Sequence, residues 1–202
     1  MTGIRTQVVG TISSVGFDGP HRFVVGCWHH TPIGPFADVM WADPDGGRTL
    51  LAGSDEAARF ITAIYQFDSV KVAPLDVFSD GRTTRVDGHG LKLELIGGRR
   101  VPLPPRRPLW LTRFVESPIA RLTMGVQTHG VSFHGATEWY QSSGWRWVRQ
   151  AGGSLGGESL GPMRPVRPAV GVGFSEPPAR PSIVSVRTVI DLPADVALGL
   201  GL

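Results

Sequence analysis

The alternation of hydrophobic and polar residues predicts a protein built mainly from β-strands. Leucine alternates strictly with Lys92 and Glu94 over residues 91–95, which is typical of a strand with one buried face. Residues 5–15, 23–29 and 182–192 are rich in β-branched and aromatic residues, which favour strands. About ten such segments follow one another at roughly even spacing, separated by turns that contain glycine or proline. This spacing favours an antiparallel sheet over a parallel α/β arrangement.

Two stretches predict short helices instead. Within residues 54–65, Ser54 is suited to cap the first turn, and Phe60, Ala63 and Ile64 share one helical face. Residues 117–125 begin with Ser-Pro and end with glycine, as a short capped helix does. The fold class that we predict is mainly β (β-rich α+β): an antiparallel barrel or strongly bent sheet with two short helices, the first packed across one end.

Proline-rich segments complete the predicted organisation. Residues 99–113 combine prolines with arginines and are expected to run extended across the surface, and residues 161–181 are extended and proline-rich. We predict a single β-rich domain over residues 1–193. Residues 194–202 are expected to form a flexible C-terminal tail.

Composition narrows the class of protein. Hydrophobic residues make up 41% of the 202-residue chain and charged residues 18%, which is too apolar for a disordered protein. The net charge is only +3, so nucleic acid is an unlikely partner. The single cysteine, Cys27, excludes an internal disulfide. With neither a signal-peptide pattern nor an apolar run of membrane-spanning length, we expect no membrane association and a cytoplasmic location.

Residues 22–53 hold the densest polar chemistry beside apolar strand sequence. Cys27 and His29 would share one face of a strand, whereas Trp28 and His30 would share the other. A thiolate nucleophile needs a base within hydrogen-bond reach, which neighbours two residues apart on a strand do not supply, so Cys27 is interpreted as a core residue. The catalytic candidates of the chain, all able to transfer protons, are His29, His30, Asp38 and Glu138.

A second group of candidates suggests a metal site. His134 and Glu138 have the spacing of part of the cupin metal motif, but Ser132 stands where that motif has a second histidine. With His129 these residues could supply three protein ligands and leave one position open for chemistry. Alternatively, these residues could belong to a hairpin whose tip is at His134, with no metal bound. The metal candidates are therefore His129, His134 and Glu138, and the sequence identifies no cofactor.

Tryptophans on predicted strands suggest a pocket. Trp28, Trp41 and Trp139 could line an apolar cavity if their side chains point inward. The ligand of such a pocket would be a small apolar molecule, or an anion if arginines contribute. The sequence lacks the G-x-x-x-x-G-K-[ST], G-x-G-x-x-G, G-x-S-x-G and C-x-x-C patterns, which argues against nucleotide, dinucleotide, esterase-type and thiol-redox chemistry.

Two segments of the sequence resemble segments of other proteins. Residues 29–46 (HHTPIGPFADVMWADPDG) and 173–184 (GFSEPPARPSIV) are similar to stretches of uncharacterised proteins of about 200 residues from high-GC actinobacteria. This resemblance implies no activity and no functional residues.

Three functions remain open from the sequence. The leading hypothesis is a small-molecule-binding β-barrel with an aromatic-lined pocket. The alternatives are a hydrolase or lyase-type enzyme with a His/Glu cluster, metal-assisted or not, and a protein-interaction module that uses the proline- and arginine-rich segments. A binding protein predicts one apolar cavity with few charges, whereas an enzyme predicts convergence of the candidate histidines and carboxylates.

Overall fold

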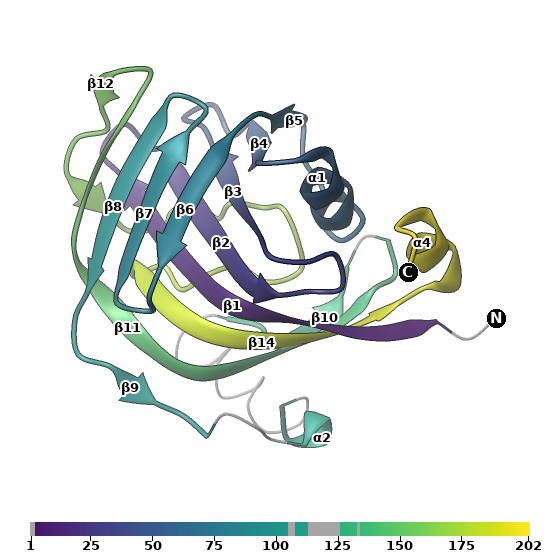
Figure 1. Ribbon diagram of the computed structural model, residues 1–202. Coiled ribbons are helices and arrows are strands. Elements are labelled where there is room, and N and C mark those ends of the chain that lie inside the picture. The colour runs from purple at the N-terminus through teal and green to yellow at the C-terminus, as the bar shows by residue number, and fades with distance from the viewer. Residues whose placement is uncertain (1–2, 105–107, 113–125, 133) are drawn as a thin grey trace.

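The strands form a single, strongly bent and open sheet (Figure 1). The computed structural model describes residues 3–104, 108–112, 126–132 and 134–202. The strands are β1 (Ile4–Phe17), β2 (Arg22–His30), β3 (Phe36–Ala42), β4 (Arg48–Ala52), β5 (Ser69–Val72), β6 (Leu75–Ser79), β7 (Thr83–Gly88), β8 (Leu91–Gly97), β9 (Val101–Pro102), β10 (His129–Val131), β11 (Thr137–Leu155), β12 (Glu158–Ser159), β13 (Met163–Arg164) and β14 (Ser182–Leu192). The helices of the described residues are α1 (Asp55–Thr62), α2 (Leu109–Leu111) and α4 (Ala194–Gly199).

The order of strands along the sheet is β5-β4-β3-β2-β1-β14-β11-β8-β7-β6. The pairs along this path are antiparallel except for β4 and β5, which are parallel. The end strands β5 and β6 are consecutive in the chain but are not paired with each other, so the sheet does not close. The mainly β class and the strongly bent sheet are thus confirmed, whereas a closed barrel is not formed.

The local patterns explain many of these elements. In β8 the leucines at 91, 93 and 95 are buried and Lys92 and Glu94 are exposed, as strict alternation predicts. At the start of α1 the amide of Ala57 donates a 3.2 Å hydrogen bond to the Ser54 side chain, which caps the helix as expected. The second predicted helix, 117–125, lies outside the described residues.

Two stretches differ from the sequence predictions. The sequence pattern predicts separate strands over residues 137–141 and 145–149, but the structure has one continuous strand, β11, because β14 pairs with its first part and β8 with its last. Residues 194–202, expected as a frayed tail, contain helix α4. Its Ala197 is buried and packs, with Leu200 and Leu202, against a hydrophobic core, so apolar contacts hold this terminus against the body of the protein.

The two faces of the sheet bury separate cores. On β2, Val24 and Trp28 contribute to a core that α1 covers, whereas Phe23 and Val25 point to the opposite face. That second core is closed by the buried leucines of β8, because the bend of the sheet brings β6, β7 and β8 over β2 and β3 (Figure 1). The division matters for function, because it determines which polar side chains meet.

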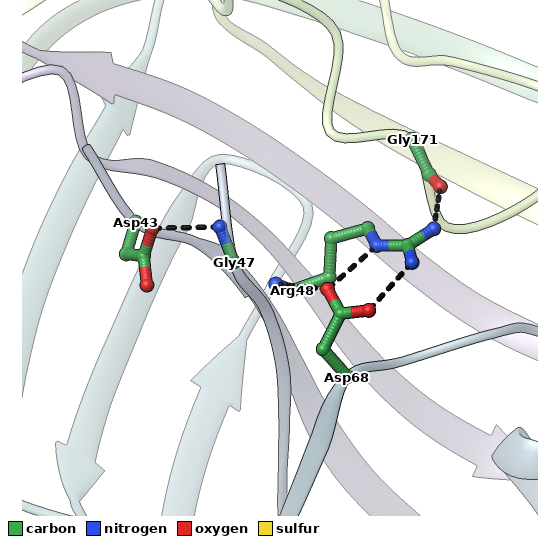
Figure 2. Close-up of polar contacts among 5 residues, drawn as sticks. All are labelled: Asp43, Gly47, Arg48, Asp68 and Gly171. Carbon is green, nitrogen blue, oxygen red and sulfur yellow. Dashed lines mark hydrogen bonds and ion pairs between the residues drawn. The ribbon is translucent and has the colours of Figure 1, made fainter. Parts of the chain in front are cut away.

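The extended residues 165–181, here called the covering segment, lie over the core that contains Trp28. Figure 2 shows how Arg48 of β4 holds this segment. The Arg48 guanidinium donates two hydrogen bonds to the Asp68 carboxylate, at 2.7 and 2.9 Å, and a third of 2.9 Å to the carbonyl of Gly171. One arginine therefore connects a sheet strand, the chain before β5 and the covering segment. In the described residues, no helix is long and apolar enough to cross a membrane.

Candidate functional site

A cavity of about 160 Å³ lies between the sheet and the covering segment. Strands β1, β2, β3, β11 and β14 supply its floor, and residues 126–128, Tyr65 and part of the covering segment supply its remaining walls. Most of the wall is apolar. Its apolar side chains from the sheet are Ile12, Val24, Met40, Val184 and Val186, and its aromatic side chains are Trp28, Tyr65, Tyr140 and Trp145.

Asp38 is a fully buried carboxyl group in this wall. Its Oδ1 accepts a 2.8 Å hydrogen bond from Trp28 Nε1. Asp38 pairs with Gly26 in the β2–β3 ladder, and an added Cβ at position 26 would lie 2.4 Å from Asp38 Oδ1 and 2.5 Å from Trp28 Nε1. Glycine at 26 therefore leaves the space in which the indole and the carboxyl group meet.

The second oxygen of Asp38 has no hydrogen-bond donor among the described residues. Burial raises the pKa of this carboxyl to about 6, and the hydrogen bond from Trp28 opposes the shift. At pH 7.5 Asp38 is therefore mostly ionised, with one oxygen unsatisfied in an apolar wall. A buried, unpaired carboxylate oxygen is costly, so a donor that reached this atom would stabilise the charged carboxylate.

Glu138 forms a second buried acidic group beside the cavity. The hydroxyls of Tyr65 and Tyr140 donate hydrogen bonds to Glu138 Oε2, at 3.0 and 2.9 Å, and also contact each other. Both tyrosines line the cavity, whereas Glu138 lies behind them in a small adjoining space that Trp28 also borders. Two hydroxyl protons cannot fill three oxygen–oxygen contacts, but a protonated carboxyl group would supply the third proton.

The pKa shifts of Glu138 and the two tyrosines agree with a carboxyl group that can hold this third proton. Burial raises the pKa of Glu138 to about 7, although hydrogen bonds from Tyr140 and Tyr65 lower it in part. Burial and the neighbouring Glu138 charge hold the pKa of both tyrosines well above the usual range, so they remain neutral donors. Glu138 Oε1 is buried and has no partner among the described residues. Glu138 can thus change protonation near neutral pH.

The histidines of β2 do not join this site. His29 and His30 are exposed at the end of the strand, and neither lines the cavity. Cys27 faces the opposite core, where its Sγ lies 3.8 Å from the carbonyl oxygen of Val77 and burial raises its thiol pKa. Of the catalytic candidates, the structure therefore places Asp38 in the cavity wall and Glu138 behind two tyrosines of that wall.

The metal candidates are not gathered either. His129 Nδ1 donates a 3.1 Å hydrogen bond to the main-chain oxygen of Glu138, and its ring stacks on Trp139 with centroids 5.0 Å apart. His134 is exposed in the turn between β10 and β11. In the part of the chain that the structure describes, no three His, Cys, Asp or Glu residues lie close enough to hold a metal ion.

The predicted tryptophans separate onto the two faces of the sheet. Trp28 lines the cavity, as the pocket hypothesis requires. Trp41 faces the opposite core and donates a 3.1 Å hydrogen bond to His21 Nδ1, and Trp139 packs between His129 and Arg5. The sequence interpretation missed Tyr65 and Tyr140, which also line the cavity. The alternation of β11 places Glu138 and Tyr140 on one face, but nothing local links them to Tyr65, which follows α1.

Comparison with known proteins assigns no family. No protein-family model and no curated protein matches the chain. A crystal structure of a Nitrosomonas europaea protein, provisionally assigned as AttH (NE1406), resembles the fold with a TM-score of 0.36 and 12% sequence identity. The match covers 94% of this chain and 52% of that one, so the chain spans about half the length of that protein. We therefore infer the function from the site itself.

Proposed function

We propose that the protein binds a small, mainly apolar molecule in the cavity beneath the covering segment. The observation that carries this proposal is a cavity of about 160 Å³ with an apolar and aromatic wall and few polar groups. Binding sites for small molecules combine these properties, because apolar contact provides affinity and a few polar groups fix orientation. Asp38 and the hydroxyls of Tyr65 and Tyr140 are the polar groups that would orient the ligand.

The volume accommodates about one ring with a short substituent. An engineered cavity of about 150 Å³ lined by apolar side chains binds benzene, and this cavity is of similar size. Toluene is therefore a suitable neutral probe, because it tests the cavity without requiring a polar partner. A titration of toluene followed by calorimetry should show saturable binding with one site per chain.

A matched pair of substitutions tests where the probe binds. Val184 of β14 lines the cavity, so Val184→Phe should fill part of it and weaken toluene binding at least tenfold. Val131 is 58% exposed on β10 and does not line the cavity, so Val131→Phe adds the same atoms elsewhere and should leave binding unchanged. Equal affinity of toluene for the wild type and for a folded Val184→Phe variant would contradict the proposed site.

Acid–base catalysis is a second candidate function, favoured by the Glu138 group. Tyr65 and Tyr140 form part of the cavity wall and bond to a carboxyl group that titrates near pH 7, which is the property of an effective general acid or base. A bound ketone offers a simple test. Wild-type protein should accelerate exchange of the acetophenone methyl hydrogens in D₂O, and Glu138→Gln should lose that acceleration while still binding toluene. An exchange rate equal to that of buffer would exclude this candidate for ketones.

A further inference from the structure

The cavity wall is acidic and contains no basic side chain among its described lining residues. Among the described residues that line it, Asp38 and Glu176 are the carboxyl groups, and none is Lys, Arg or His. Glu176 is already satisfied, because its two oxygens accept hydrogen bonds of 2.9 and 2.7 Å from the amides of Val170 and Gly171. Asp38 is therefore the carboxyl group of the wall with an oxygen that has no hydrogen-bond donor among the described residues.

The surroundings of Asp38 determine what could satisfy that oxygen. Trp28 uses its one N–H on Oδ1, and Oδ2 is buried without a donor among the described residues. An ammonium group carries three donors and a positive charge, so it would both fill the missing hydrogen bond and neutralise the buried charge. An anionic ligand, which the sequence left open, would instead add repulsion in the same wall.

The aromatic side chains support the same ligand charge. Trp28 and Trp145 line the cavity together with Tyr65 and Tyr140. Aromatic faces attract cations, most strongly where water is excluded. Apolar residues such as Val24 and Val184 on the same floor would contact an uncharged hydrocarbon body.

We propose that the ligand of this cavity is a small apolar amine, bound as its cation with the ammonium group donating to Asp38 Oδ2. This inference rests on the proposed function, because it assigns the chemical class of the ligand that the same cavity binds. It names Asp38 as the residue that determines specificity. The remaining wall contributes apolar and aromatic contact.

Four probes that share a benzene ring with a one-carbon substituent test the proposal at pH 7.5: benzylamine, benzyl alcohol, toluene and benzoate. We expect calorimetry of the wild-type protein to show benzylamine binding at least tenfold more tightly than benzyl alcohol or toluene, and benzoate not binding. Asp38→Asn should lose the preference for benzylamine while it keeps toluene binding. Asp87→Asn makes the same change of charge at an exposed position on β7 and should keep the preference.

The results of this experiment distinguish failure of the amine assignment from failure of the proposed binding cavity. If toluene or benzyl alcohol binds the wild type as tightly as benzylamine, or if benzoate binds best, the amine assignment is wrong while the binding cavity stands. If none of the four probes binds, both proposals fail. The affinities of the wild-type protein for the four probes test the amine assignment even if Asp38→Asn does not fold.

Discussion

The indole nitrogen of Trp28 donates a 2.8 Å hydrogen bond to Asp38 across two neighbouring strands. Gly26 lies between them in the ladder and contributes no side chain, so the contact forms directly over its Cα. The hydrogen bond fixes one oxygen of a buried carboxyl group and leaves the other without a donor among the described residues. The specificity that we propose for the site depends on this arrangement.

Gly26→Ala should disrupt the contact. Its Cβ would lie 2.4 Å from Asp38 Oδ1 and 2.5 Å from Trp28 Nε1, so at least one side chain must move and the hydrogen bond is weakened or lost. We expect the free energy of unfolding to fall by about 1–3 kcal/mol, the usual cost when a buried polar group loses its partner. Urea denaturation measures this change.

Gly152→Ala is the matched control for that experiment. Gly152 lies on β11, and an added Cβ there meets no atom within 4 Å. The change should alter the free energy of unfolding by less than about 0.5 kcal/mol, as surface substitutions usually do. Equal destabilisation by both substitutions would mean that loss of glycine in a strand, rather than crowding of Trp28 and Asp38, is responsible.

The pH dependence of the free energy of unfolding should reveal the titration of Glu138. Its pKa is about 7 in the folded protein and near 4.5 in the unfolded chain, so the folded state binds more protons between these values. By linkage, the free energy of unfolding must decrease as pH rises from about 4.5 to about 7, and its Glu138 component is constant outside that window. The loss is on the order of 3 kcal/mol.

Glu138→Gln removes this titration. Asp38 also has a raised pKa, of about 6, so both proteins should lose some stability as pH rises from about 4 to 6. The difference between wild type and Glu138→Gln should therefore isolate the contribution of Glu138, with the wild type losing more stability up to pH 7. Parallel stability curves for the two proteins over this range would show that Glu138 does not titrate as described.

Arg48 should hold the covering segment in place. Arg48→Met keeps much of the aliphatic side chain but removes the hydrogen bonds to Asp68 and to the Gly171 carbonyl. We expect faster amide hydrogen exchange in residues 165–181 and faster dissociation of toluene, because this segment covers the cavity. The sheet core should keep its protection, since Arg48 is not part of either core.

Arg85→Met provides the comparison for Arg48. Arg85 forms an exposed ion pair with Glu94 on the β7–β8 ladder, away from the cavity wall. Its loss should leave exchange in the covering segment and the toluene dissociation rate unchanged. A similar effect of both substitutions on residues 165–181 would argue against a specific role for Arg48.

Features that depend on nearby residues could be predicted from the sequence. Ser54 caps α1, and the leucines of β8 alternate inward, because capping and strand alternation act over a few residues. The continuity of β11 could not be predicted in this way, because its two halves are supported by two strands that lie far apart in the sequence, β14 and β8. The packing of α4 likewise depends on a distant core.

The site was predicted only in part for the same reason. Asp38, Glu138 and Trp28 were candidates, but their meeting depends on strand register and on Tyr65, which lies far from Tyr140 in sequence. The histidines were candidates because of their residue type. In the structure, however, His29 and His30 are exposed at a strand end and His134 is exposed in a turn. Residue types indicate which chemistry a side chain can perform. The bend of the sheet determines which of these side chains line the same cavity.

The most direct test of the account is to locate a bound probe. Amide ¹H–¹⁵N spectra of the ¹⁵N-labelled protein should be recorded during a toluene titration. The account predicts saturable shifts concentrated at cavity residues such as Ile12, Met40 and Val184, with little change at Leu93 and Leu95 in the opposite core. Absence of saturable shifts, or shifts centred on the opposite core, would contradict the claim that this cavity binds small apolar molecules.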